Sequence, residues 1–449
     1  MRDGLIANLA LPADLALTAE RGGAGEGTSA GQEQIDCRGL WVVPGAIDAH
    51  VHSRDPGFPD KEDWTTLTSA AAVGGVTTVL DMPNTVPAVD TAEVFAAKAE
   101  IAARRAVVDF GLWGLLRSSS SPEAVADLLA GGAVGLKAFL GYAFQRSRRA
   151  VTYTVALDDP DLEAPPGYET IRRLGPELAR RGALLAVHAE DPDTLRERAR
   201  HLGDYADVLA ARPAEAEARA IATCGRLAGA LKFRLHLVHV SSAEGLAAAI
   251  AGKYHQAADV SIETCPQYLW VTADDYARVG NALRMNPPVR EAADRAALRA
   301  ALVAGELDTV GTDHAPHTDS EKFAVDLDHC HPGGPGVQTL LLSQLQLGRD
   351  LGITEQAVRM VTANVAQRFG LAGKGRIEPG ADADLVLVDA AGRTVATAES
   401  MLSRQKHGVL EGMAFDFAIR QVYSRGELVA ESGRVVAAPG RGRLVRPAV

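Results

Sequence analysis

Short apolar runs alternate with alanine-rich amphipathic stretches from about residue 41 onward. We expect the apolar runs to be strands that are buried on both faces, because helices cover both sides of a parallel sheet. The predicted strands lie within residues 41–52, 75–82, 108–116, 133–140, 183–190, 233–240, 259–264 and 307–314. The predicted helices lie within residues 65–75, 121–132, 169–182, 214–230, 242–252 and 294–305. About eight such units predict an α/β fold of the (β/α)8 barrel type, the TIM barrel.

The two ends of the chain have a different pattern from the middle. Residues 1–46 are rich in glycine and β-forming residues, and residues 373–449 alternate between turn signals as antiparallel strands do. We expect these ends to pair into one small composite β domain beside a barrel that occupies residues 47–372. Residues 145–168 form a long segment with little helical pattern, and we expect it to cover the pocket as a lid.

Composition and charge narrow the class of protein. The chain has 449 residues, of which 47% are hydrophobic, so it can bury a large core. Its formal net charge of -11 and its scattered Lys and Arg residues leave no basic surface for a phosphate backbone, which argues against a nucleic-acid partner. No apolar run approaches the roughly 20 residues that span a bilayer, and no signal peptide is evident. We therefore expect a cytoplasmic protein that has no contact with membranes.

Two other patterns carry little weight. The cysteines form no CxxC pair, so we expect buried thiols rather than a disulfide framework or a cysteine zinc site; they are Cys37, Cys224, Cys265 and Cys330. Residues 27–31 read GTSAG, which fits the GxSxG pattern of serine hydrolases. That pattern needs a strand before it and a helix after it, whereas this copy lies in a glycine-rich stretch.

Polar residues gather at the C-terminal ends of the predicted strands, where (β/α)8 barrels build their active sites. His50 and His52 end one strand at positions i and i+2, so their imidazoles point to the same side. Other strands end at His188, His239 and Asp313. Imidazoles and a carboxylate that meet on one rim indicate a site for a metal such as zinc. By the same alternation, we expect His236 on the opposite face of its strand from the histidine three residues later.

Lys137 lies within the apolar run AVGLKAFLGYAF, residues 133–144, where the only other ionisable side chain is Tyr142. An ammonium group is a poor zinc ligand, and burying it without a partner costs free energy. If carbon dioxide carboxylates the amine, the product is an anionic carbamate whose two oxygens can bridge two cations about 4 Å apart. The alternative is a lysine that extends to the barrel rim or pairs with an acid.

Several segments closely resemble the cyclic amidohydrolases, which are the dihydroorotases, allantoinases, hydantoinases and dihydropyrimidinases. In chain order they are PGAIDAHVHSRDPGFPDKEDW, AAAVGGVTTVLDMPNTVP, GLKAFLGY, AVHAED, LHLVHVSSAEG, ETCPQYL and GTDHAPHTDSEK. The resemblance covers nearly the whole chain and implies a barrel, a small composite β domain and a binuclear zinc centre. It places His50, His52 and Asp313 on the first metal, carboxylated Lys137 as the bridge, and His188 and His239 on the second metal.

The resemblance also implies an activity. The two zinc ions would lower the pKa of a bridging water, and the resulting hydroxide would attack the carbonyl of a small cyclic amide or ureide. Asp313 would accept the proton and later deliver it to the ring nitrogen that leaves. The family habit suggests a homodimer or a homotetramer.

Substrate-contacting positions resemble two different members of the family. Arg54, Asn84 and His317 match the positions with which dihydroorotases hold the carboxylate of their substrate, a task that suits a guanidinium, an amide and an imidazole. Tyr142 falls where hydantoinases place a tyrosine that donates to the developing oxyanion, although an aromatic residue at a strand end also serves simple packing.

Further positions resemble the hydantoinase group. These are Gln267 in ETCPQYL and the PGGPG segment around Gly334. We expect Asn286 of RMNPPV near the ring, through its backbone or its side chain. Three separated positions match the single task of binding a carboxylate, so we expect dihydroorotase-type activity, with hydantoinase, dihydropyrimidinase or allantoinase activity as the alternative. The non-enzyme alternative is a catalytically silent structural homologue, but a mere scaffold has no physical reason to fill all six ligand positions.

Overall fold

Parallel strands close into a barrel in the computed structural model, which describes residues 5–6, 35–153, 159–255 and 258–448. Three neighbouring strands are β2 (Ala46–Val51), β3 (Val76–Asp81) and β4 (Asp109–Leu112). The order continues through β5 (Gly114–Leu115), β6 (Leu136–Phe139), β10 (Leu184–His188), β11 (Arg234–Leu237), β12 (Val260–Thr264) and β13 (Thr309–Val310). A parallel bridge from Val51 to His314 joins the last strand to the first, which confirms the predicted barrel.

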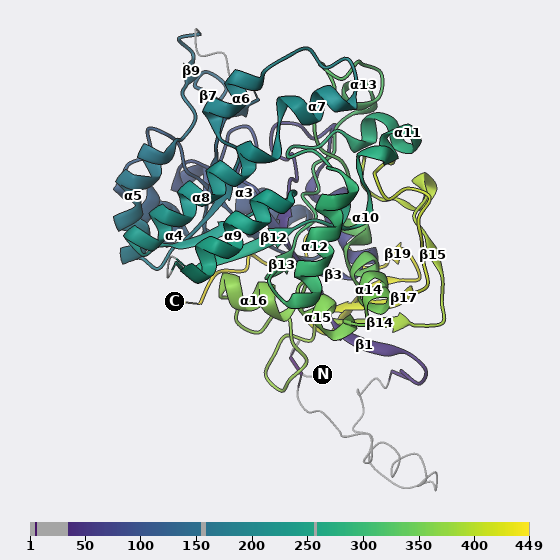
Figure 1. The fold of residues 1–449 in the computed structure, drawn as a ribbon. Helices are drawn as coiled ribbons and strands as arrows, with labels where there is room; N and C mark the ends of the chain where they lie inside the picture. The colour runs from purple at the N-terminus through teal and green to yellow at the C-terminus, as the bar shows by residue number, and fades with distance from the viewer. Residues whose placement is uncertain (1–4, 7–34, 154–158, 256–257, 449) are drawn as a thin grey trace, which may run out of the picture.

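Helices cover the outside of the barrel (Figure 1). The longer ones are α2 (Trp64–Val73), α3 (Ala92–Arg105), α4 (Pro122–Gly131), α5 (Tyr168–Arg180), α8 (Ala214–Leu231), α9 (Ala243–His255), α12 (Ala292–Ala304) and α14 (Leu340–Leu351). The shorter ones are α6 (Pro192–Arg198), α7 (Tyr205–Ala211), α10 (Pro266–Trp270), α11 (Tyr276–Val279), α13 (Asp319–Lys322), α15 (Thr354–Arg359) and α16 (Ala363–Phe369). Side chains cap several of them, as when Asp63 accepts from the backbone N–H of Thr66 at the start of α2. The prediction missed α3, although Thr91 caps it in the same way.

The two ends of the chain meet in one antiparallel sheet. β1 (Trp41–Pro44) pairs with β14 (Leu385–Asp389), and the sheet continues through β17 (Ala418–Ser424), β18 (Glu427–Glu431) and β19 (Arg434–Val435). A smaller pair is formed by β15 (Thr394–Val395) and β16 (Ala414–Phe415). Figure 1 shows this sheet on one side of the barrel. The exact domain limits at residues 46 and 372 stay a prediction.

Gly45 corrects one predicted strand. We expected a single strand within residues 41–52, but the chain changes sheets at Gly45, so that β1 lies in the small domain and β2 in the barrel. A Cβ atom on Gly45 would lie 2.2 Å from the Thr77 Oγ1 atom. The chain can therefore turn here only because this residue has no side chain.

The segment after Tyr142 is more regular than expected. It contains β7 (Ala143–Gln145), β8 (Ala150–Thr152) and β9 (Leu162–Glu163), which form a three-stranded antiparallel sheet in the order β8, β7, β9. Arg117 fastens this small sheet to the barrel, because its guanidinium lies 3.8 Å from the centre of the Phe144 ring and also binds Asp90 and Glu163.

Two other sequence-based expectations concern the GTSAG motif and membrane-spanning segments. The GTSAG segment lies outside the described residues. No helix in the described part of the chain has the length and apolar character needed to cross a membrane.

Candidate metal centre and substrate pocket

A cavity opens at the C-terminal ends of the barrel strands. Its wall includes His50, His52, His188, His239 and Asp313, together with Asn84, Tyr142 and Asn286. Two residues of the segment 145–168, Val151 and Tyr153, also line it. Predicted polar residues of widely separated strands therefore converge on one space, whereas Lys137, Arg54 and His317 are not among its lining residues.

The first histidine pair lies against a carboxylate. Oδ1 of Asp313 is 3.2 Å from Nε2 of His50 and 3.0 Å from Nε2 of His52. The opposite ring nitrogens are held from behind, since Nδ1 of His50 is 2.9 Å from Oε1 of Glu263 and Nδ1 of His52 is 2.7 Å from Oδ1 of Asn84. A partner on Nδ1 leaves the Nε2 lone pair of each imidazole facing the cavity, as metal binding requires.

The second histidine pair is held differently, because a carboxylate holds His188 only, and Nδ1 of His239 has no hydrogen-bond partner in the described structure. Nδ1 of His188 and Nε2 of His239 lie only 2.9 Å apart, while Nε2 of His188 is held 2.8 Å from Oε2 of Glu190. His239 and Asp313 both follow their strands with positive φ angles, 44° and 52°. Such angles are uncommon for residues other than glycine and are concentrated at functional sites.

Lys137 is fully buried in the middle of β6. Its Nζ atom has no hydrogen-bond partner within the described chain. Burial lowers the pKa of this amine to about 8, which favours the neutral form that can react with carbon dioxide. Burial is also the main cause that lowers the pKa of His50, and the nearby Lys137 is the second.

This donor set fits divalent metal ions. The four imidazoles are buried and their pKa values are lowered chiefly by burial, so they are neutral and able to bind metal. His50, His52 and Asp313 present ligand atoms within 4.8 Å of one another. The partnerless Lys137 amine lies beside them. The cavity is therefore a histidine-rich candidate metal site, and the assignment of single ligands stays a prediction.

Arg54 and His317, which are both predicted to bind a substrate carboxylate, lie next to each other. Nη2 of Arg54 is 3.1 Å from Nε2 of His317, and Nε of Arg54 donates to the Pro316 carbonyl at 3.1 Å. Arg54 is only 6% exposed, yet no carboxylate of the described residues forms an ion pair with it. Nδ1 of His317 also lacks a hydrogen-bond partner, and its nearest acid, Glu321, is 3.8 Å away.

The remaining predicted contacts take different positions. Asn84 lines the cavity and uses its oxygen for His52, so its amide N–H groups remain for a ligand. Asn286 lines the cavity too, and its side chain donates to the Tyr142 hydroxyl at 3.1 Å. The carbonyl of Gly334 already accepts from Ala315 at 2.8 Å. The neighbouring Gly333, rather than Gly334, lines the cavity.

His236 is not directed away from the site, and that expectation is wrong. Its Nε2 atom lies 3.3 Å from Oε2 of Glu263, the same carboxylate that holds His50. The alternation rule failed because β11 ends at Leu237, before His239 adopts its positive φ. Glu263, Glu190 and Arg212 were not predicted from the sequence; the signal for Glu263 was a charged residue inside a buried strand.

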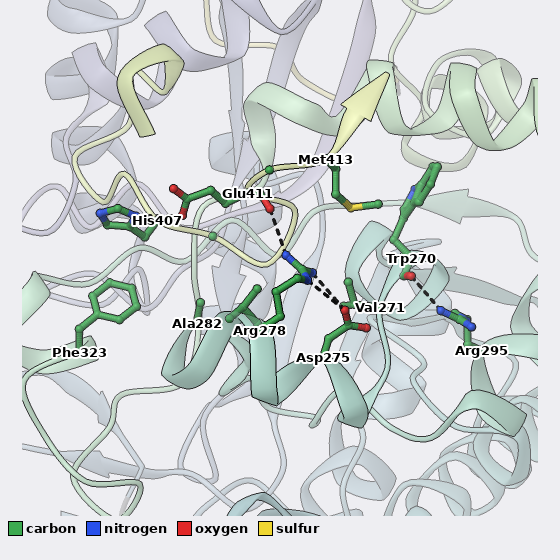
Figure 2. Close-up of a pocket in the computed structure, with 13 residues that line it drawn as sticks. Trp270, Val271, Asp275, Arg278, Ala282, Arg295, Phe323, His407, Glu411 and Met413 are labelled. Carbon is green, nitrogen blue, oxygen red and sulfur yellow. Dashed lines mark hydrogen bonds and ion pairs between the residues drawn. The ribbon is translucent and has the colours of Figure 1, made fainter. Parts of the chain in front are cut away.

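A second cavity lies beside α10 and α11 (Figure 2). Its charged side chains are occupied by protein partners. Arg278 binds Asp275 and the carbonyls of Val409 and Glu411, and Arg295 binds the carbonyl of Trp270. This cavity has none of the converging imidazoles of the first one, so it does not compete as the site of chemistry.

Known proteins resemble this chain over most of its length. Residues 41–429 match the Amidohydrolase family. An allantoinase of Deinococcus radiodurans is 38% identical over 92% of this chain and 90% of its own. A dihydroorotase of Halobacterium salinarum is also 38% identical, over 78% of this chain and 76% of its own.

A solved structure agrees with these relatives. The L-hydantoinase (dihydropyrimidinase) from Arthrobacter aurescens superimposes with a TM-score of 0.85 at 28% identity, covering 99% of this chain and 95% of that one. Family match, relatives and fold all lead to the same group of enzymes. The chain belongs to the amidohydrolase family and is a cyclic amidohydrolase, a hydrolase of C–N bonds in cyclic amides.

Proposed function

We propose that the substrate is a cyclic amide that carries a carboxylate, and that the reaction is of the dihydroorotase type, from dihydroorotate to N-carbamoyl aspartate. One observation carries this proposal: Arg54 is a buried guanidinium without an acidic partner in the described structure. A buried charge needs a counter-charge. A ring-borne carboxylate would supply it, and His317 and the free amide of Asn84 would bind the remaining carboxylate oxygen.

We further propose that two divalent ions, zinc by expectation, complete the site. His50, His52 and Asp313 would hold one ion, His188 and His239 the other, and a carboxylated Lys137 would bridge them. When bound, the ions would lower the pKa of a water molecule, so that hydroxide is available as the nucleophile near neutral pH. The buried Nζ of Lys137 supports the carbamate, because it has neither a hydrogen-bond partner nor an acidic partner in the described structure, although it lies 5.0 Å from the centre of the Phe139 ring.

The chain's own residues would then move the proton and stabilise charge. Asp313 borders the cavity beside both histidines of the first pair and would accept the proton of the attacking water. It would return this proton to the ring nitrogen as the C–N bond breaks. Tyr142 would donate to the carbonyl oxygen as that oxygen becomes negative.

Allantoin hydrolysis is the second candidate. Two relatives named allantoinase reach the same 38% identity as the dihydroorotase over a larger share of this chain, and Tyr142, at the position that resembles hydantoinases, lines the cavity. A ureide side chain, however, would leave the charge of Arg54 uncompensated. Assembly as a homodimer or homotetramer and a place in the cytoplasm remain further proposals.

A hydrolysis panel of dihydroorotate, hydantoin, dihydrouracil and allantoin tests the proposal. We expect the metal-loaded protein to prefer dihydroorotate, and Arg54→Ala to lower kcat/KM for that substrate by roughly a hundredfold, as loss of a charge-assisted bidentate contact should. Arg172→Ala, which removes an exposed arginine of α5 paired with Glu169, is the control. Preference for allantoin, or full dihydroorotate activity in Arg54→Ala, would refute the carboxylate assignment.

A further inference from the structure

We propose that Arg212 is a positioning residue that directs the hydroxyl proton of Tyr142 into the cavity. The inference rests on the proposed role of Tyr142 as a donor to the reacting carbonyl. It adds a residue on another element, at the end of α7, that links this phenol to the second histidine pair.

The structure holds the guanidinium of Arg212 firmly in place. Its side chain is only 15% exposed, and its Nε donates to both oxygens of Glu190, at 3.1 and 3.2 Å. Nη2 donates to a Glu190 oxygen as well and to the Tyr142 hydroxyl oxygen at 3.0 Å. The backbone carbonyl of Arg212 accepts from Arg290 at 3.0 Å, which fixes the chain where α7 ends. A planar guanidinium fixed by a fork of contacts has little freedom to turn.

The hydroxyl oxygen of Tyr142 receives two donors from the protein. One is Nη2 of Arg212 and the other is Nδ2 of Asn286, at 3.1 Å. Neither group can accept a hydrogen bond, because a guanidinium has only N–H donors and this side of the Asn286 amide is its NH2. The phenol's own proton must therefore turn away from both. No acceptor for it exists among the described residues, and the side that stays open is the cavity.

Glu190 links this arrangement to the candidate metal centre. The same carboxylate that holds Arg212 also lies 2.8 Å from Nε2 of His188, and the ring of Tyr142 packs edge-on against His188 with centroids 4.9 Å apart. Burial raises the pKa of Tyr142, so the phenol keeps its proton even beside a guanidinium. One buried acid thus orients an imidazole through one contact and, through Arg212, a proton donor.

A double-mutant cycle tests the inference on the metal-loaded enzyme. Arg212→Lys keeps the charge beside Glu190, but a single ammonium cannot serve both Glu190 and Tyr142 as the fork does. We expect Arg212→Lys to lower kcat about tenfold with little change in KM, because the affected contact strengthens only in the transition state. In a Tyr142→Phe background, which itself lowers kcat, the same substitution should change kcat less than twofold.

The two proposals fail in different ways. If Tyr142→Phe leaves kcat unchanged, the proposed role of Tyr142 is wrong. If Tyr142→Phe lowers kcat but Arg212→Lys lowers it equally in both backgrounds, only the positioning role of Arg212 is wrong. We expect the metal content of Arg212→Lys to equal that of the wild type. A lowered metal content would instead mean that the substitution disturbs His188 through Glu190 and not only Tyr142.

Two other variants complete the experiment. Arg219→Lys is the matched control, since this exposed arginine of α8 lies 3.7 Å from Asp191, the neighbour of Glu190, and should keep the wild-type kcat. If Arg212→Lys does not fold, Asn286→Asp tests the same geometry. A carboxylate there accepts the phenol proton and withdraws it from the cavity, so kcat should fall; wild-type kcat in Asn286→Asp would overturn the inference.

Discussion

Two buried lysines differ in whether the surrounding protein compensates their charge. Lys98 and Lys137 are both almost completely inaccessible to solvent. Lys98 pairs with the carboxylate of Asp81 and donates to the carbonyl of Met82 at 3.0 Å, so its charge is compensated by the protein. The amine of Lys137 has no such partner in the described structure. Burial without compensation favours the neutral amine, the form that carboxylation requires.

Removing Lys137 should therefore remove metal. We expect Lys137→Ala to lose most bound metal and activity, because the bridging anion disappears, and we expect propionate to restore part of both by filling the space with a carboxylate. Metal analysis and activity with and without propionate measure this. Lys253→Ala, which removes a lysine paired with Asp308 away from the cavity, should retain its metal. Normal metal content in Lys137→Ala would refute the carbamate bridge.

Lys322 gives a prediction about pH and stability. Burial lowers the pKa of this lysine from its ordinary 10.5 to about 7, and nearby Arg284 opposes its charge too. The unfolded chain thus binds a proton at Lys322 up to about pH 10.5, whereas the folded chain releases it above about pH 7. Between these values unfolding takes up a proton, so the contribution of Lys322 to the free energy of unfolding rises with pH.

Comparison with Lys322→Met isolates this contribution. As the pH rises from about 6.5 to about 9.5, the urea concentration at the unfolding midpoint should increase more for the wild type than for the variant, because methionine has no charge to bury. The pKa shift corresponds to a change in the free energy of unfolding on the order of a few kcal/mol over this pH range. Lys253→Met, at a half-buried lysine, should track the wild type. Parallel pH profiles for the wild type and Lys322→Met would contradict the assigned shift.

At the scale of elements, burial on both faces made the barrel strands predictable. Continuous apolar runs located β3, β6, β10 and β12 to within a few residues. The ends of strands were less predictable, because backbone angles such as the positive φ of His239 depend on tertiary contacts that leave no periodic signal. The strands β7, β8 and β9 were missed for another reason. They are only two or three residues long and hold together by pairing with each other, not by an apolar pattern.

The lid segment gives a prediction at this scale. Gln145 and Leu162 are paired across β7 and β9, so an Asn-Gly turn that replaces residues 146–161 would close a two-residue hairpin and keep the register. The deletion removes Val151 and Tyr153 from the cavity wall, and we expect KM to rise roughly tenfold for every substrate hydrolysed. Metal content should stay the same, because no predicted ligand lies in the segment. Unchanged kinetic constants on all substrates would show that the segment is not a lid.

At the scale of the whole molecule, the sequence supported the barrel, the pairing of its ends and the converging polar residues. It did not determine the substrate, because the same residues resemble dihydroorotases at Arg54 and hydantoinases at Tyr142. It also assigned the last residues to the small β domain, whereas some of them lie beside a barrel strand. Residues 440–445 have no apolar periodicity, yet they run beside β4, with Phe110 donating to Arg443 at 3.0 Å and accepting from Val445 at 2.8 Å.

Gly442 makes this docking of the tail testable. Its backbone N–H donates to the carbonyl of Ala106 at 3.0 Å, and a Cβ atom there would lie 2.2 Å from the carbonyl oxygen of Val108. Because that oxygen belongs to the backbone, Gly442→Ala must displace the tail. We expect the free energy of unfolding to fall by about 2 kcal/mol. Thermal unfolding and protease cleavage of the C-terminus measure it. In Gly252→Ala, within α9, the new methyl group would lie 3.7 Å from the Cα atom of Gly225 in α8, an ordinary contact, so this variant should be neutral or stabilising, since alanine favours helices. If both variants unfold at the wild-type temperature, the tail contributes nothing to the stability of the barrel.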